Sequence, residues 1–272
     1  MPKAASSSLQ VGLFSRLTSH TYLGLYPMGN VTGPASQAAP EGIAFQNDAD
    51  LRDFWKTLHH RPETPDMAAR FAAISERWNR DSRPLLLSHE ALTSCLFSTP
   101  NLKAKSHAAA RAFGDVEILL VRRDALGWLS SQYRDHPFDP RAPTAGPAVS
   151  FDEWVQILLT ELPCFADMLR PGSLESVWRE RFDTVTVLDF AKLVALNTAE
   201  VARLAAALGQ PRDLVTDLLA EAHENRGLSD ADVRARRRAR GFGSNPEPDD
   251  PDLFALSTSS AALLEEISDS AP

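Results

Sequence analysis

The sequence predicts an α/β fold with an open, mostly parallel central sheet flanked by helices. Two observations lead to this fold class. First, three short runs are continuously apolar instead of alternating, which is typical of strands covered on both faces. These runs are Pro84–Ser88, Val116–Val121 and Val185–Asp189. Second, segments with helical periodicity separate the runs, as βαβ units require.

Helices are expected where apolar residues recur every three to four positions between breakers. The first begins at the serines 6–8, because Leu9, Leu13 and Leu17 recur at helical spacing. Others are expected over residues 48–60, 67–79, 125–134, 151–169, 174–180 and 198–208. Residues 27–42 and 137–149 are rich in proline and are expected to form loops, and the second loop could lie over a site.

The organisation expected from these patterns is one α/β domain over residues 1–245, followed by a peripheral helix and flexible tail over 246–272. The chain has 272 residues, of which 43% are hydrophobic, so it can bury a large core. A Pro/Asp-rich stretch, residues 246–252, separates the two parts.

Composition excludes several classes of protein. The formal net charge is -8, which disfavours a general nucleic-acid or anionic-membrane binder. The two cysteines, Cys95 and Cys164, form no metal or disulfide motif, and no carboxylate pair suggests a metal. The longest apolar run, Val116–Val121, has six residues, against about 20 for a membrane span. The first ten residues lack a secretory signal, so we expect a cytoplasmic location.

One constellation follows the second apolar run. Arg123 stands where this run ends, and Ser131 comes eight residues later in the next predicted helix. Open α/β folds bind ligands at the carboxyl ends of their strands. An arginine and a hydroxyl there can hold a phosphate through charge-assisted hydrogen bonds. The alternative is an ordinary strand-to-helix turn with an exposed Arg122–Arg123 pair.

A second constellation opens the chain as Lys3-Ala4-Ala5-Ser6-Ser7-Ser8-Leu9-Gln10. A lysine, small residues and hydroxyls at the start of a helix are typical of an anion cradle. Lys3 lies three residues before the first serine, so the segment is not a Walker A loop. The alternative is a flexible, serine-rich terminus.

The two constellations together resemble motifs of the sulfotransferases that use 3'-phosphoadenosine 5'-phosphosulfate (PAPS). The first segment is similar to their Lys-x-Gly-Thr-Thr-x-Leu motif, and Arg123, Ser131 and Tyr133 match their second motif. The segments RPLLLSHEAL, VWRERFDTVTVLDFAKL and HENRGLSD are similar to later family elements, so the order matches over about residues 2–230. The resemblance implies a P-loop-like sulfotransferase fold. In the family a strand precedes this lysine, but here only Met1 and Pro2 precede Lys3. We therefore expect the natural start of the chain to lie upstream.

The resemblance also implies roles for individual residues. Lys3, Ala4, Ala5 and the serines Ser6, Ser7 and Ser8 would hold the 5'-phosphosulfate, with Lys3 stabilising charge on the bridging oxygen. Arg123 and Ser131 would hold the 3'-phosphate. Either Glu90 or His89 would accept the proton of the acceptor, and the resemblance favours Glu90; a Glu that merely begins a helix is the alternative. No metal is required, because a sulfuryl group carries less negative charge than a phosphoryl group.

Two other features leave alternatives open. His20 could approach the site or be a solvated loop residue. The arginines 234, 236–238 and 240 faintly resemble a family loop for the 3'-phosphate, but a solvated helix face is the better default.

The sequence therefore predicts a sulfotransferase that moves a sulfuryl group from PAPS to a hydroxyl or amine on a small molecule or carbohydrate. One rival is a sulfotransferase-like protein that has lost catalysis and binds a nucleotide or a partner. Another is a nucleotide kinase with an atypical loop, although no GK[ST] sequence is present.

Overall fold

The structure is a computed structural model that describes residues 8–24, 48–79, 82–89, 92–93, 102–142, 146–222, 229–239 and 253–269. The chain divides into two units. The first unit comprises Met1–Ser94, Thr99–Arg123 and Val177–Arg226. The second unit comprises Cys95–Ser98, Asp124–Ser176 and Gly227–Pro272.

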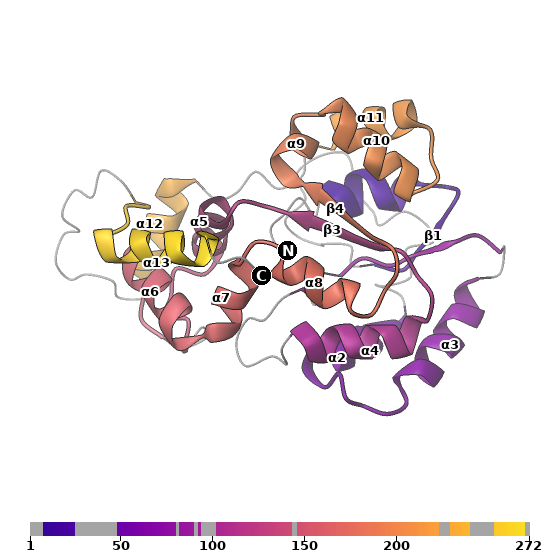
Figure 1. The fold of residues 1–272 in the computed structure, drawn as a ribbon, viewed down its shortest axis with the longest axis horizontal. Helices are drawn as coiled ribbons and strands as arrows, with labels where there is room; N and C mark the ends of the chain where they lie inside the picture. Colours follow the sequence, from indigo (N-terminus) through magenta and orange to yellow (C-terminus); the bar gives the residue numbers. More distant parts are fainter. Residues whose placement is uncertain are drawn as a thin grey trace. The chain divides into compact units, whose positions relative to one another are not determined.

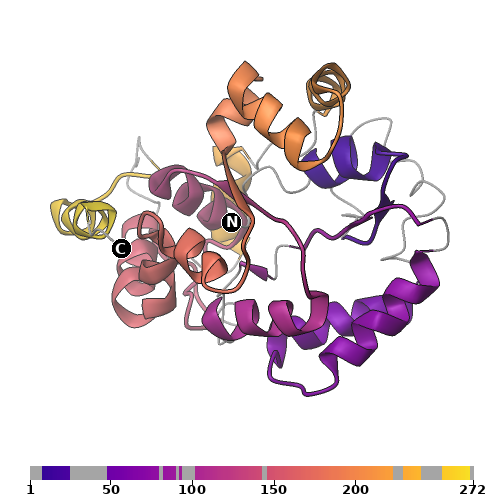
Figure 2. The same ribbon diagram turned by 45° about the vertical axis from the view of Figure 1, so that its right-hand side comes forward.

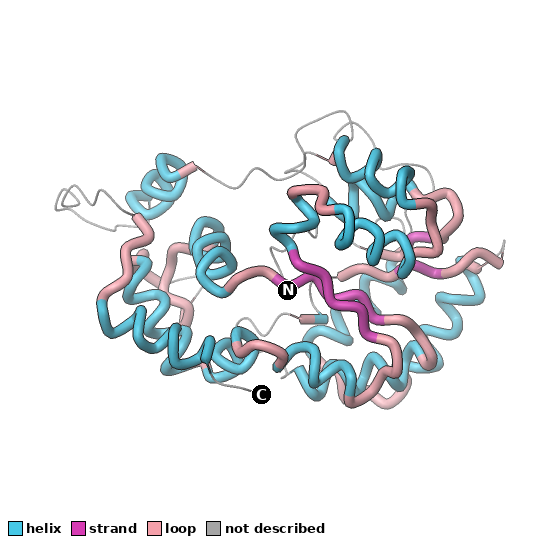
Figure 3. Tube along the Cα trace, turned by 45° about the horizontal axis from the view of Figure 1, so that its top comes forward, coloured by secondary structure: helices cyan, strands magenta, loops and turns pink. Residues whose placement is uncertain are grey.

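The strands of the first unit form two parallel pairs. Strand β1 (Thr21–Tyr22) pairs with β2 (Leu85–Leu86). Strand β3 (Ile118–Arg122) pairs with β4 (Val185–Asp189), and the two strands run side by side in Figure 3. The register places Arg122 opposite Asp189. The α/β class and the three strands expected from the sequence are therefore confirmed, as two short parallel sheets. Strand β1 was not expected from the sequence.

Helices cover the strands of the first unit on two sides (Figures 1 and 2). On one side lie α2 (Ala49–His60), α3 (Met67–Trp78) and α4 (Leu102–Phe113). On the other lie α9 (Phe190–Val194), α10 (Thr198–Ala207) and α11 (Arg212–Glu221), together with the π-helical turn η1 (Ser8–Leu13) and the 3-10 turn η2 (Phe14–Arg16). Helix α8 (Ser173–Arg179) runs from the second unit into the first.

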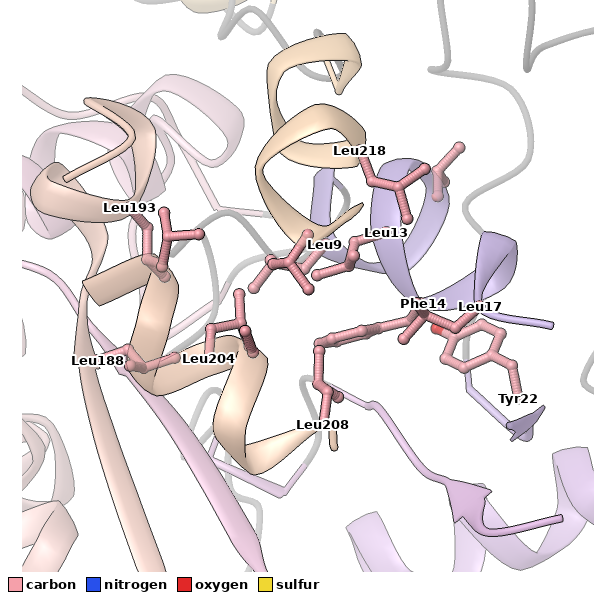
Figure 4. Packing of buried hydrophobic residues seen from close by; sticks show 14 residues of the cluster. Leu9, Leu13, Phe14, Leu17, Tyr22, Leu188, Leu193, Leu204, Leu208 and Leu218 are labelled. Carbon is pink, nitrogen blue, oxygen red and sulfur yellow. The ribbon is translucent and has the colours of Figure 1, made fainter. Parts of the chain in front are cut away.

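The two faces of the strands bury different hydrophobic clusters. Leu85 and Leu87 pack into the α2–α4 cluster, whereas Leu86 between them packs into the η1 cluster on the opposite face. This alternation follows from the two-residue period of a strand. The α2–α4 cluster contains Leu23, Leu51, Phe54, Trp55, Leu58, Met67, Phe71, Ile74, Ala108 and Ala112. The η1 cluster contains Leu9, Val11, Leu13, Phe14, Leu17, Tyr22, Leu188, Leu193, Val201, Leu204, Ala205, Leu208, Val215 and Leu218 (Figure 4).

The outer edge of β4 is closed by side chains. Arg179 Nη2 donates to the carbonyl of Val185 at 2.8 Å, and Arg203 Nη2 donates to the carbonyl of Val187 at 2.5 Å. Unpaired backbone groups at a sheet edge invite pairing with another strand. These guanidinium groups satisfy the carbonyls of Val185 and Val187, so those two edge groups already have a partner within the chain.

The second unit contains five helices in its described residues. They are α5 (Ala125–Asp135), α6 (Phe151–Glu161), α7 (Pro163–Leu169), α12 (Asp230–Ala239) and α13 (Thr258–Asp269). A single helix over 151–169 was wrong: Pro163 begins α7 and separates it from α6. Proline lacks an N–H and its ring clashes with the preceding turn, so it starts a helix more readily than it continues one.

Helix length bears on membrane insertion. Within the described ranges, no helix is both long and apolar enough to cross a lipid bilayer.

Close packing at Gly12 predicts a steric effect on stability. A Cβ at position 12 would lie 2.2 Å from the Cβ of Ala222, which follows α11. We expect Gly12→Ala to lower the free energy of unfolding by about 1–3 kcal/mol, because overpacking forces backbone shifts. Urea titration followed by circular dichroism would measure the change.

The matched control is the double variant Gly12→Ala with Ala222→Gly. Removing the methyl of Ala222 makes room, so the double variant should recover most of the loss, and a double-mutant cycle isolates the contact. A Gly12→Ala variant as stable as the unaltered chain would contradict the close approach of η1 and α11.

Candidate functional site

Arg123 lies at the carboxyl end of β3, as the sequence predicts. It is the first residue after the strand, and it follows the last register pair, Arg122 and Asp189. Its side chain is half-buried, and the guanidinium carbon lies 4.7 Å from the centre of the Phe190 ring. Because Phe190 begins α9 directly after β4, the arginine and the ring stand side by side at the same edge of two parallel strands.

The turn that carries Phe190 is held by hydrogen bonds. The side chain of Asp189 caps α9 by accepting the amide N–H of Lys192 at 3.0 Å. The backbone N–H of Asp189 donates to Oε2 of Glu200 at 3.4 Å, and Glu200 is also paired with Arg203. These bonds hold the end of β4 and the start of α9 without any ligand.

Ser88, beyond the end of β2, meets η1. The amide of Gln10 donates to the hydroxyl of Ser88 at 3.1 Å, and Ser88 also forms a side-chain hydrogen bond with Tyr22 of β1. Burial raises the pKa of Tyr22 well above 10.0, so its hydroxyl stays protonated. The hydrogen bond from Gln10 therefore joins η1, which follows the serine-rich start of the chain, to the exit of β2.

His89, the next residue, enters a basic cluster that we define as Trp55, His59, His89 and Lys105. The ring of His89 stacks on Trp55 with 4.9 Å between centres. Lys105 of α4 is fully buried, and its Nζ lies 3.1 Å from Nδ1 of His59 in α2.

Burial, more than the neighbouring charges, keeps His89 neutral. Burial lowers the pKa of His89 to about 3, and the charges of His59 and Lys105 act in the same direction. A group with so low a pKa is a weak proton acceptor near neutral pH, because it binds protons poorly. His89 is therefore better suited to packing against Trp55 than to general-base chemistry.

The structure locates the remaining predicted residues as follows. Lys3, Ala4, Ala5, Ser6, Ser7 and Glu90 lie outside the described residues, and Ser8 is the first residue of η1. Ser131 is half-buried in α5, in the second unit, whereas Arg123 ends a segment of the first. Tyr133 is fully buried and donates from its hydroxyl to the carbonyl of Val149 at 2.6 Å, which is a role in the core.

His20 lies at the amino end of the β1–β2 pair. It directly precedes β1, whose first residue donates its N–H to the carbonyl of Pro84. It therefore lies at the amino end of the β1–β2 pair, opposite to the end where Ser88 meets Gln10. Burial lowers the pKa of His20.

Sequence reasoning missed His59, Lys105 and Phe190. The alanine-rich stretch around Lys105 has high helix propensity, which was a usable signal for α4. From sequence, however, a lysine within such a stretch is expected to be exposed to solvent. Only the packing of α4 against α2 and α3 buries it. Phe190 carries no sequence signal of its own, because its role depends on the strand register.

Two further observations bear on the identity of the site. Among the described residues, no three side chains of His, Cys, Asp or Glu are placed to hold a metal ion. No protein-family model, curated protein or solved structure matches this chain.

The state of His89 predicts a pH dependence of stability. Its pKa is about 3 in the folded chain and about 6.5 in the unfolded chain, so only the unfolded chain takes up this proton between those values. The contribution of neutral His89 is present above about pH 6.5 and is lost as the pH falls toward 3. The free energy of unfolding should drop by up to about 1.4 kcal/mol per pH unit in that window.

Urea unfolding of the unaltered chain and of His89→Gln, from pH 7.5 to 4.5, would measure this slope. His107→Gln, on the exposed side of α4, is the matched control and should leave the slope unchanged. Parallel curves for the unaltered chain and His89→Gln would contradict the buried neutral histidine.

Proposed function

We propose that this protein is a sulfotransferase that moves a sulfuryl group from PAPS to a hydroxyl or amine acceptor, with small molecules and carbohydrates as the candidate acceptors. The observation that carries the proposal is the half-buried Arg123 at the carboxyl end of β3, beside the parallel strand β4. This edge is where open α/β folds bind ligands, and a guanidinium group there suits a phosphate. The proposal assigns the 3'-phosphate of the donor to Arg123.

Ser131 stays a prediction for the same phosphate. Its hydroxyl would add one neutral donor to the charged donors of Arg123. Because charge-assisted hydrogen bonds are about twice as strong as neutral ones, most of the affinity for the 3'-phosphate is assigned to Arg123.

The donor's phosphosulfate is assigned to Lys3 and the serines Ser6, Ser7 and Ser8. Two contacts in the described residues support this assignment. Leu9, directly after the serines, is buried in the η1 cluster, and Gln10 is bonded to Ser88 at the exit of β2. The serines are therefore followed by a segment, Leu9 and Gln10, that is anchored beside the exit of β2. Glu90, the expected base, follows that strand in the sequence.

The surroundings of His89 favour Glu90 as the base. His89 has a pKa of about 3 and its ring is stacked on Trp55, so it is a poor proton acceptor. A carboxylate with an ordinary pKa of about 4.3 binds a proton more strongly than this histidine does. The proposal therefore assigns the acceptor's proton to Glu90.

The chemical step follows from these assignments. The acceptor oxygen or nitrogen forms a bond to sulfur while the bond from sulfur to the bridging oxygen breaks. The acceptor's proton passes to Glu90, and Lys3 stabilises the charge that develops on the bridging oxygen. The products are the sulfated acceptor and 3',5'-adenosine bisphosphate. In-line positioning and charge stabilisation account for catalysis of this kind.

Binding of 3',5'-adenosine bisphosphate tests the proposal directly. Calorimetric titration should show tighter binding of the bisphosphate than of 5'-AMP, because only the bisphosphate carries a 3'-phosphate. Arg123→Ala should weaken bisphosphate binding by about 10- to 100-fold, since a hydrogen bond to a charged group contributes about 1.5–3 kcal/mol. Binding of 5'-AMP should change little.

Arg122→Ala is the matched control, because Arg122 is the exposed neighbour within β3. Equal binding of the two nucleotides, or unchanged bisphosphate binding by Arg123→Ala, would contradict the assignment. Incubation with radiolabelled PAPS and a panel of hydroxyl and amine acceptors then tests turnover. A chain that binds the bisphosphate but labels no acceptor would be a binding protein instead of an enzyme.

A further inference from the structure

Residues 253–269, which we call the C-terminal strap, belong to the second unit and end in α13. This helix is yellow in Figure 1, and it contacts α6 and α7. Only three of its twelve residues are buried, namely Ser260, Leu264 and Ile267. Helix α6, by contrast, buries six apolar residues out of eleven. A segment with so few buried apolar side chains is at the low end of local stability within a domain.

Hydrogen bonds to Asp152, in the first turn of α6, hold the start of α13. The backbone N–H of Ser257 donates to Oδ1 of Asp152 at 2.8 Å, and the hydroxyl of Ser257 donates to the same oxygen at 2.9 Å. Burial alone would raise the pKa of Asp152, but hydrogen bonds from Ser260 and Ser257 outweigh it, and the pKa is lowered. These bonds favour the carboxylate, so the carboxylate in turn favours the attached strap.

Phe254 joins the strap to α5 and α6. Its ring centre lies 5.2 Å from that of Phe151 and 6.1 Å from that of Tyr133, both edge-on. The guanidinium carbon of Arg134 lies 4.3 Å from the centre of the Phe254 ring, and Arg134 also forms an ion pair with Asp230 of α12. Release of the strap would therefore remove contacts from α5, including one at the residue that pairs with α12.

Ser257 has two roles that respond differently to charge. Its hydroxyl accepts the amide N–H of Ser260 at 3.3 Å, so it caps α13. Aspartate caps a helix about as well as serine, and negative charge is favourable at the start of a helix. A carboxylate at position 257 would, however, stand next to that of Asp152, and like charges at such a distance repel each other. Added negative charge should therefore preserve the cap and break the contact with α6.

We propose that the C-terminal strap opens and closes on the second unit as one piece, with Asp152 and Ser257 as its charge-sensitive latch. The inference is independent of the proposed function, because every contact that carries it lies within the second unit and involves no nucleotide. A twelve-residue helix is only marginally stable by itself in water, so the open strap exposes its amides to solvent. The state of the strap thereby determines how firmly α5 is held.

Hydrogen–deuterium exchange of the full chain, followed by mass spectrometry, tests this device. Peptides from residues 258–269 should exchange at least about 10-fold faster than peptides from α6. Asp152→Ala should raise the exchange of the strap by about 10-fold more, because hydrogen bonds to a charged group are lost. Glu153→Ala is the matched control, since Glu153 is the exposed neighbour in the same turn of α6, and it should leave the strap unchanged.

Ser257→Asp separates the latch from the helix cap. A residue that only capped α13 could be replaced by aspartate without effect, whereas the latch requires strap exchange to rise by about 10-fold. Ser257→Thr keeps the hydroxyl and should retain the protection. The double variant Asp152→Asn with Ser257→Asp removes the repulsion and should recover most of it.

Three results would overturn the proposal. The first is a strap that exchanges as slowly as α6 in the unaltered chain. The second is a Ser257→Asp chain whose strap exchange is unchanged. The third is an equal rise in the strap, α5 and α6 of this variant, which would mean that the whole second unit loosens and that the strap does not open as one piece.

Discussion

The rest of the first unit depends on the pairing of β3 with β4 and on the burial of both faces of the strands. Parallel strands expose two apolar faces, so both must be covered by helices. The alternation of Leu85, Leu86 and Leu87 between two clusters shows how this requirement is met. The same pairing also aligns the ends of the strands, because the register that joins Arg122 to Asp189 brings Arg123 beside Phe190.

The exit of β2 shows a second consequence of strand geometry. Successive side chains point to opposite faces, so Ser88 meets Gln10 on the η1 side while His89 meets Trp55 of α2. One face thus carries a neutral hydrogen-bonded network and the other a basic cluster with a buried lysine. A buried ammonium is tolerated only where hydrogen bonds compensate its lost hydration, which restricts how α2 and α4 can pack.

The fold could be predicted where local signals were strong. Continuous apolar runs located β2, β3 and β4, and helical periodicity located α2, α3, α5 and α10. The prediction failed where local signals were ambiguous. Strand β1 has two residues, too few for any periodicity, and the helix expected over residues 151–169 is interrupted because Pro163 cannot continue it.

The sequence by itself determined the α/β class, the parallel direction of the paired strands and the place of Arg123 at a strand end. These features follow from periodicity and from the types of residues that are close together in the sequence. Only the tertiary structure decided the neighbours of those residues. The stacking of Phe190 on Arg123 depends on a strand register, and the contact of Lys105 with His59 depends on the packing of two helices. Contacts between residues more than 40 positions apart have no local signature, so they arise only when the elements pack together.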